Sequence, residues 1–220
     1  MIKENLNRVK KSIPSHVTLV AVSKTKPNEL IEEAYAAGQR VFGENKAQEL
    51  KSKAEALPND IEWHFIGHLQ TNKVKYIAPY TSLVHSIDSL KLLKEVNKQA
   101  LKNNRVINCL LQFHIATEES KFGLSLEESL QLINSEEFIA LKNIKIVGVM
   151  GMASFVNSEE QVKTEFASLK NIFDQLKSGY FKQSDDFKII SMGMSGDFKL
   201  AIETGSNMVR VGSLIFGNRN

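Results

Sequence analysis

The sequence predicts a single (β/α)8 barrel of the TIM type over residues 1–220, with an extra helix at the N-terminus. Short runs rich in β-branched residues alternate with amphipathic stretches about eight times, as expected when a helix follows each parallel strand. With 220 residues, 42% hydrophobic and 24% charged, the chain can bury one substantial core. An open, doubly wound sheet would show the same alternation and is the structural alternative.

The expected elements follow one another along the chain. Ile2–Lys11 has amphipathic spacing and is expected to be the extra helix, lying against the bottom of the barrel. The expected strands are His16–Ser23, Arg40–Gly43, Glu62–Gly67, Leu83–Ile87, Val106–Ile115, Ile144–Met150, Phe187–Ser191 and Met208–Val211. Amphipathic periodicity predicts helices at Asn28–Ala37, Lys46–Ala56, Gln70–Ala78, Ser89–Lys102, Leu126–Asn134, Glu159–Lys177 and Phe198–Glu203.

Composition excludes several classes of protein. The formal net charge is only +3 and the lysines are interspersed with acids, so nucleic acid is not an expected partner. No hydrophobic run is long enough to span a membrane and the N-terminus lacks an apolar signal core, so we expect a cytoplasmic protein. The one cysteine, Cys109, lies in an apolar run and is expected to be a buried, inert thiol.

Lys24 ends the first expected strand. It follows the apolar run Leu19–Val22, and Pro27 opens the next helix. Partial burial of an ammonium group lowers its pKa and makes the amine nucleophilic, which is how lysines that form Schiff bases arise. Taken alone, Lys24 is better explained as a structural lysine that extends from a strand end to solvent, and the functional interpretation depends on what the far end of the chain supplies.

Further polar residues follow the other expected strands. In a barrel of this kind the active groups lie at the carboxyl ends of the strands. These positions hold Gly43-Glu44-Asn45, Gly67-His68, His85-Ser86 with Asp88, Lys121, Met150-Gly151, the segment 191–197 and Arg210-Val211-Gly212-Ser213.

The last two strand ends predict an anion site. Ser195-Gly196-Asp197 opens a helix directly after a strand, so that free backbone N–H groups point outward at a positive dipole end. Gly212-Ser213 supplies further amides and a hydroxyl, and barrels usually hold a phosphate at these two loops. A simple N-cap would explain either loop alone. The two loops together favour a phosphate site.

Arg210 lies within an otherwise apolar strand, where a buried guanidinium needs an acceptor. Glu203 is one candidate partner, and a heteroaromatic nitrogen of a bound cofactor is the other. A Schiff-base lysine, a phosphate cradle and an inward arginine together describe a pyridoxal 5'-phosphate site.

Six segments of the chain resemble the pyridoxal phosphate homeostasis proteins. They are Ala21–Lys26, Phe42–Asn45, Trp63–Lys73, His85–Asp88, Ser191–Asp197 and Val209–Gly212, so the resemblance covers nearly the whole chain. That family is similar to the barrel domain of alanine racemase, without the racemase's C-terminal β domain. The expected fold is therefore the alanine racemase N-terminal barrel.

The resemblance implies a role for each site residue. Lys24 would carry the cofactor as an aldimine, and Arg210 would face the pyridine nitrogen. Ser195, Gly196, Gly212 and Ser213 would hold the phosphate, Asn45 and Ser86 would lie near the polar edge of the ring, and Met150 would pack on a ring face. The family is described as non-enzymatic regulators of vitamin B6 pools. Transient contact with pyridoxal-dependent apo-enzymes is compatible with that role.

Catalysis would need more than these residues. Racemisation requires a second acid/base opposite the lysine, which in the racemase is a tyrosine of the β domain. The four tyrosines, Tyr35, Tyr76, Tyr80 and Tyr180, fall on expected outer helices or their ends. The chain ends directly after the eighth strand, so no β domain is expected, and a monomeric carrier is favoured over a catalyst.

Two other functions stay open, namely a small pyridoxal-dependent amino-acid racemase and an aldolase-like barrel that uses Lys24 on a sugar phosphate.

Lys121 is either a second amine that assists cofactor exchange or a solvated loop lysine. His64, His68 and His85 lie on separate segments without a clustered ligand motif, so no metal site is expected. We expect these histidines to form hydrogen bonds within the barrel top or to line the cofactor mouth.

Overall fold

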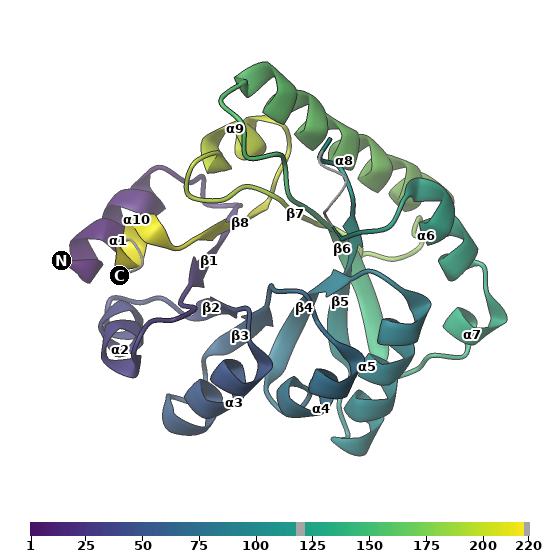
Figure 1. Cartoon of the computed structure of the whole chain (residues 1–220), viewed down its shortest axis with the longest axis horizontal. Helices are drawn as coiled ribbons and strands as arrows, with labels where there is room; N and C mark the ends of the chain where they lie inside the picture. The colour runs from purple at the N-terminus through teal and green to yellow at the C-terminus, as the bar shows by residue number, and fades with distance from the viewer. Residues whose placement is uncertain (118–121, 218–220) are drawn as a thin grey trace.

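The computed structural model describes residues 1–117 and 122–217, and the strands of this part close into a parallel barrel (Figure 1). The strands are β1 (Thr18–Val22), β2 (Val41–Glu44), β3 (Glu62–Phe65), β4 (Thr81–Ile87), β5 (Ile107–Phe113), β6 (Ile144–Gly151), β7 (Ile189–Ser191) and β8 (Met208–Val211). Each strand pairs with the next, and β8 pairs with β1, with Val20 opposite Arg210. The predicted barrel is confirmed, and the open sheet is excluded because the sheet has no free edge.

Helices surround the barrel (Figure 1). They are α1 (Ile2–Lys11), α2 (Asn28–Ala36), α3 (Ala47–Ala56), the 3-10 turn η1 (Thr71–Lys73), α4 (Val74–Ile77), α5 (Leu90–Lys102), α6 (Leu126–Ile133), α7 (Glu136–Ile139), α8 (Glu159–Gly179), α9 (Phe198–Glu203) and α10 (Ser213–Phe216). Within the described residues, no helix is long and apolar enough to cross a membrane.

Four of these helical elements differ from the sequence prediction. The expected helix Gln70–Ala78 is divided into η1 and α4, and the short helices α7 and α10 were not predicted. Both unpredicted helices span a single turn, which is too short for an amphipathic period to show. Only the cap of α7 carries a signal, because the Ser135 hydroxyl accepts a hydrogen bond from the N–H of Phe138.

The N-terminal helix α1 lies in the outer ring of helices rather than against the bottom of the barrel. It packs beside α10 and α2 (Figure 1), with Ile2, Leu6 and Val9 buried. The Asn5 side-chain amide donates to the carbonyl of Ile215 at 3.2 Å. The apolar face of α1 thus packs beside the four-residue α10 and helps to cover this part of the barrel.

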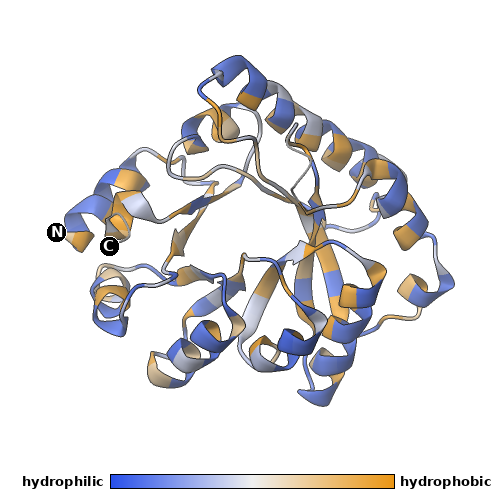
Figure 2. Cartoon of the chain, in the orientation of Figure 1, coloured by the Kyte–Doolittle hydropathy of each residue, from blue (hydrophilic) through white to orange (hydrophobic). Residues whose placement is uncertain are grey.

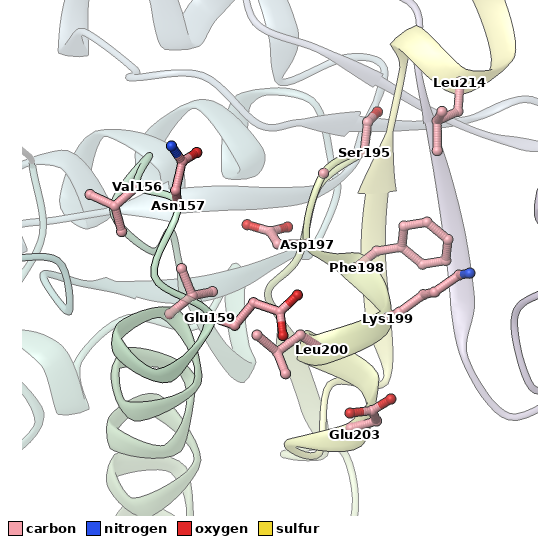
Figure 3. Close-up of a pocket in the computed structure, with 12 residues that line it drawn as sticks. Val156, Asn157, Glu159, Ser195, Asp197, Phe198, Lys199, Leu200, Glu203 and Leu214 are labelled. Atoms are coloured by element: carbon pink, nitrogen blue, oxygen red, sulfur yellow. The ribbon is translucent and has the colours of Figure 1, made fainter.

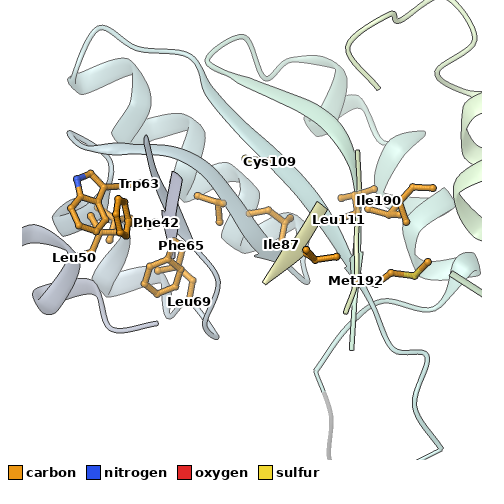
Figure 4. Close-up of a cluster of buried hydrophobic side chains, with 14 of the residues drawn as sticks. Phe42, Leu50, Trp63, Phe65, Leu69, Ile87, Cys109, Leu111, Ile190 and Met192 are labelled. Carbon is orange, nitrogen blue, oxygen red and sulfur yellow. The ribbon is translucent and has the colours of Figure 1, made fainter. Parts of the chain in front are cut away.

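The hydrophobic core has two layers. The larger lies between the strands and the helices, whose outer sides carry hydrophilic residues (Figure 2). It includes Phe42 and Trp63, with ring centroids 6.0 Å apart, and Cys109, whose predicted burial is confirmed (Figure 4). Burial raises the pKa of the Cys109 thiol, which keeps it protonated and unreactive. The smaller layer fills the barrel interior and consists of Val20, Leu83, Leu110, Val147, Met150 and Met208.

Gly148 allows β6 and β7 to approach closely. Its φ is +155°, and a Cβ at this position would lie 1.9 Å from the carbonyl oxygen of Ile189. Gly148→Ala is therefore expected to lower the free energy of unfolding by about 2 kcal/mol, since the strands must separate or the backbone must shift. Urea denaturation would measure this loss. In the control variant Gly179→Ala the new Cβ meets nothing within 4 Å, so an equal loss there would contradict this explanation.

Candidate functional site

A cavity of about 640 Å³ opens at the carboxyl ends of the strands. This is the end at which barrels of this architecture place their functional groups. The cavity is lined by Val22, Lys24, Lys26, Asn45, Ile66, Gly67, His68, Met152, Phe155, Met194, Ser195, Gly196, Asp197, Arg210, Gly212, Ser213 and Gly217. Seven of the nine predicted site residues therefore line one cavity, although they come from segments far apart in the sequence.

Lys24 is half-buried in the turn between β1 and α2. It comes two residues after the end of β1, so the strand delivers its side chain to the cavity wall. The next residue, Thr25, has a φ of +65°, which is unusual for a β-branched residue. Lys26, which the sequence analysis did not single out, lines the same cavity.

The two predicted anion-binding loops adjoin one another. The Ser195 hydroxyl accepts a hydrogen bond from the backbone N–H of Gly212 at 3.2 Å, so Ser195 joins the loop after β7 to the loop after β8 rather than capping α9. Asp197 Oδ1 accepts from the N–H of Met194 at 2.5 Å and closes the first loop. A Cβ added at Gly196 would meet nothing within 4 Å, so there is open space in front of this loop.

A second hollow of about 510 Å³ lies on the other side of the loop after β7 (Figure 3). It is bounded by the start of α8 and by α9, and it shares Ser195, Gly196 and Asp197 with the first cavity. The loop is therefore accessible from both sides.

Arg210 lies inside the barrel, with its side chain almost fully buried in β8. One guanidinium nitrogen donates to the Ser191 hydroxyl at 2.6 Å and to the Ser191 carbonyl at 2.9 Å, and the other donates to the Gly151 carbonyl at 3.1 Å. Burial lowers the pKa of Arg210 to about 10, an effect that the negative charge of Asp197 partly opposes. Glu203, the alternative partner considered from the sequence, is exposed, and the acceptors of Arg210 among the described residues are Ser191 and Gly151 instead.

Two buried histidines continue from Arg210 across the barrel. His85 Nδ1 lies 3.0 Å from the Ser191 hydroxyl, and His85 Nε2 lies 3.1 Å from His64 Nδ1. Arg210 can only donate, so the Ser191 hydroxyl accepts from it. With the Ser191 hydroxyl proton directed to His85 Nδ1, the neutral His85 would carry its proton on Nε2 and donate to His64 Nδ1. Burial lowers the pKa of His64 to about 3 and lowers that of His85 well below its usual range, so both rings are neutral.

His68 is separate from this chain of hydrogen bonds and lines the cavity mouth. Its Nδ1 lies 3.5 Å from Asp88, and its ring stacks on Phe122 with centroids 4.0 Å apart. Across the described residues, no group of three or more His, Cys, Asp or Glu side chains is arranged to hold a metal ion.

The structure separates Asn45 from Ser86 and Met150. Asn45 lines the cavity, and its buried Oδ1 has no hydrogen-bond partner within the described residues. Ser86 and Met150 are buried in β4 and β6 and do not line the cavity. Met152 lies there instead, because residues two apart along a strand direction share a face and Met152 is one layer closer to the mouth.

Two cavity residues had weak sequence signals. Ile66 and Phe155 are single apolar residues after strands, and Phe155 is 98% exposed. Their position after β3 and β6 is the signal that could have indicated them. Lys121 lies outside the described residues.

The comparisons with known proteins agree with this geometry. The family model for the alanine racemase N-terminal domain matches residues 1–220. A pyridoxal phosphate homeostasis protein of Aquifex aeolicus is 42% identical over 202 residues, which cover 91% of this chain and 86% of that protein. The structure of PipY of Synechococcus elongatus with pyridoxal phosphate bound is 32% identical and covers 99% of this chain and 100% of PipY, with a TM-score of 0.84.

An alanine racemase of Clostridium difficile shares the fold, with a TM-score of 0.76 at 15% identity. It covers 99% of this chain, whereas this chain covers 56% of the racemase. By the extent of these matches, and in agreement with the resemblance of its motifs, the chain belongs to the pyridoxal phosphate homeostasis protein family.

Proposed function

We propose that this protein binds pyridoxal 5'-phosphate covalently through Lys24 and acts in vitamin B6 homeostasis without catalysing a reaction. The observation that carries the proposal is the convergence of Lys24, Arg210 and the two adjoining loops on one cavity. When bound, the cofactor supplies an aldehyde that bonds reversibly to amines. Reversible bonding is suited to a protein that holds and releases its ligand.

The charges of the residues that line the cavity suit the negatively charged phosphate of this cofactor. Lys24, Lys26 and Arg210 line the cavity together with one carboxylate, that of Asp197, and an excess of cations attracts a phosphate dianion. The open space at Gly196 and the backbone groups of Gly196, Gly212 and Ser213 are the proposed phosphate cradle, with Ser195 as a hydroxyl partner.

The residues also fit the ring of the cofactor. The buried Asn45 Oδ1, which lacks a partner in the described residues, would accept a hydrogen bond from the ring hydroxyl. Arg210 would donate to the pyridine nitrogen and so hold it unprotonated. Contacts of Ser86 and Met150 with the ring remain predictions; the buried Ser86 Oγ has no hydrogen-bond partner within the described residues.

The positions of the tyrosines support a binding role over catalysis. Tyr35 donates to Asp60 at 2.6 Å and Tyr80 donates to Glu55 at 2.7 Å, both outside the barrel. None of the four tyrosines lines the cavity. The alternative function, a small amino-acid racemase, would have to use another group, and His68 with Asp88 is the candidate at the mouth. A monomeric state and transient contact with apo-enzymes remain predictions.

The proposal is tested by mixing the purified protein with pyridoxal 5'-phosphate, before and after borohydride reduction. We expect a visible absorption band that reduction removes, together with a stoichiometric mass increase. Incubation of the loaded protein with amino acids in D2O is expected to give no exchange of the α-proton. A protein that takes up no cofactor contradicts the proposal. Exchange that is lost in His68→Gln would favour the racemase, and trapping of a keto-sugar phosphate would favour the aldolase-like function.

A further inference from the structure

A buried cluster of charged side chains lies beside the Lys24 turn. Lys53 of α3 is almost fully buried, and its Nζ donates to Glu44 Oε1 at 2.8 Å and to Glu49 Oε1 at 2.7 Å. Glu44 is the last residue of β2 and is fully buried. Glu49 lies one helical turn before Lys53 on α3.

This cluster holds both peptide groups that adjoin Lys24. Lys53 Nζ donates to the carbonyl of Ser23 at 2.8 Å, and this carbonyl belongs to the peptide group before Lys24. Glu49 Oε1 accepts from the N–H of Thr25 at 2.6 Å, and this N–H belongs to the peptide group after Lys24. The Cα of Lys24 is therefore fixed from both sides by two residues of one helix.

Ser23 adds a third connection between the turn and the cluster. Its hydroxyl donates to Glu44 Oε1 at 2.5 Å, and its backbone N–H donates to the carbonyl of Gly43 at 3.0 Å. The Lys24 turn is thus bound to the end of β2 as well as to α3.

Thr25, next to Lys24, has an uncommon backbone conformation with a φ of +65°. A positive φ is costly for a β-branched residue, by about 1–3 kcal/mol, and persists only where the surroundings enforce it. Two contacts hold it here. The Lys26 N–H donates to the Ser23 carbonyl at 3.0 Å and closes the turn, and the Thr25 N–H donates to the Glu49 carboxylate in a charge-assisted hydrogen bond.

Burying this cluster is also costly. A buried lysine with two carboxylates is commonly no more stable than apolar side chains of similar size. Burial raises the pKa of Glu44, while Lys53 and the Ser23 hydroxyl act in the opposite direction. The same helix also carries an ion pair that is accessible to solvent, Lys51–Glu55 at 3.7 Å, and such a pair contributes little to stability.

We propose that Lys53, together with Glu44 and Glu49, is a positioning device that sets the direction of the Lys24 side chain toward the bound aldehyde. This inference rests on the proposed function, because it concerns the rate at which the covalent bond forms. Without the cluster the Lys24 turn would relax to an ordinary φ, and the amine would point toward the aldehyde for a smaller share of the time. The phosphate loops and Arg210 come from other strands, so binding that does not involve Lys24 would be unchanged.

The test compares Lys53→Met with Lys51→Met, the same substitution two residues away on α3. Pyridoxal 5'-phosphate is mixed with each apoprotein, and the visible band is followed with time. Affinity for pyridoxine 5'-phosphate, which lacks the aldehyde, is measured separately. We expect Lys53→Met to slow formation of the covalent bond by about tenfold or more, with the affinity for the analogue within about twofold. Lys51→Met is expected to change neither quantity.

A second variant covers the case in which Lys53→Met fails to fold. Glu49→Gln keeps an acceptor for the Thr25 N–H at a position whose side chain is 21% exposed, but removes one of the two charges that hold Lys53. It is expected to slow bond formation by a smaller factor of about three. If the folded variants formed the covalent bond at the wild-type rate, the positioning role would be wrong, while the proposed function would stand. If the wild type itself formed no covalent bond, the proposed function would fail and this inference with it.

Discussion

Lys24→Ala is expected to abolish covalent attachment of pyridoxal 5'-phosphate. The variant lacks the amine that bonds to the aldehyde, while Arg210 in β8 and the two anion-binding loops after β7 and β8 remain in place. Residual binding is expected to be roughly 100-fold weaker, which corresponds to the loss of about 3 kcal/mol from one reversible covalent bond. Borohydride reduction followed by mass spectrometry would detect the missing label, and a visible-band titration would measure the affinity.

Lys26→Ala is the matched control for this experiment. Lys26 lines the same cavity two residues further along the turn, so its loss removes one positive charge from the same wall. This variant is expected to keep the covalent label and to lose only a small part of its affinity for the phosphate. Label that persisted in Lys24→Ala and disappeared in Lys26→Ala would move the attachment site to Lys26.

The second large effect is a loss of stability in mild acid. Burial lowers the pKa of His64 to about 3, whereas in the unfolded chain it returns to about 6.5. Below pH 6.5 the unfolded state therefore binds a proton that the folded state does not, so the stabilisation that is complete above pH 6.5 is lost as the pH falls toward 3. At pH 5 this loss amounts to about 2 kcal/mol for His64, and the lowered pKa of His85 adds a loss of the same sign.

Urea denaturation of the apoprotein at pH 8 and pH 5 would measure this effect. The variant His64→Gln removes one of the two buried titrating groups and is expected to show a markedly smaller difference between the two pH values, whatever its stability at pH 8. If His64→Gln lost as much free energy of unfolding between pH 8 and pH 5 as the wild type, the explanation would be wrong, because His64 would then be protonated at pH 5 in the folded wild type as well.

Much of the fold could be predicted because strand and helix periodicities differ along this chain. The expected β8 and α9 have the bounds that the structure shows, and the expected β4 and β6 differ from the observed strands by one or two residues at one end. The position of α1 could not be predicted. Its apolar face requires a partner, but only the packed barrel shows that the gap beside α10 supplies one.

The candidate site was predictable to the level of strand ends. Lys24, Asn45, Arg210 and the two loops were placed there by the rule that barrels carry their functional groups at the carboxyl ends of the strands, and they line one cavity. Depth along a strand was not predictable. Met150 lies in the inner core, while Met152, two residues further along, reaches the cavity. Both positions are apolar methionines, so the apolar pattern does not show which of them lines the cavity.

The sequence by itself determined the barrel, the family and the candidate lysine, because these depend on local periodicity and on motifs that are contiguous in the chain. Only the tertiary structure revealed the ion cluster of Glu44, Glu49 and Lys53 around the Lys24 turn and the hydrogen-bonded chain from Arg210 to His64. These contacts join side chains on different strands and helices. Closure of the barrel sets the distances between them, and no local pattern in the sequence records those distances.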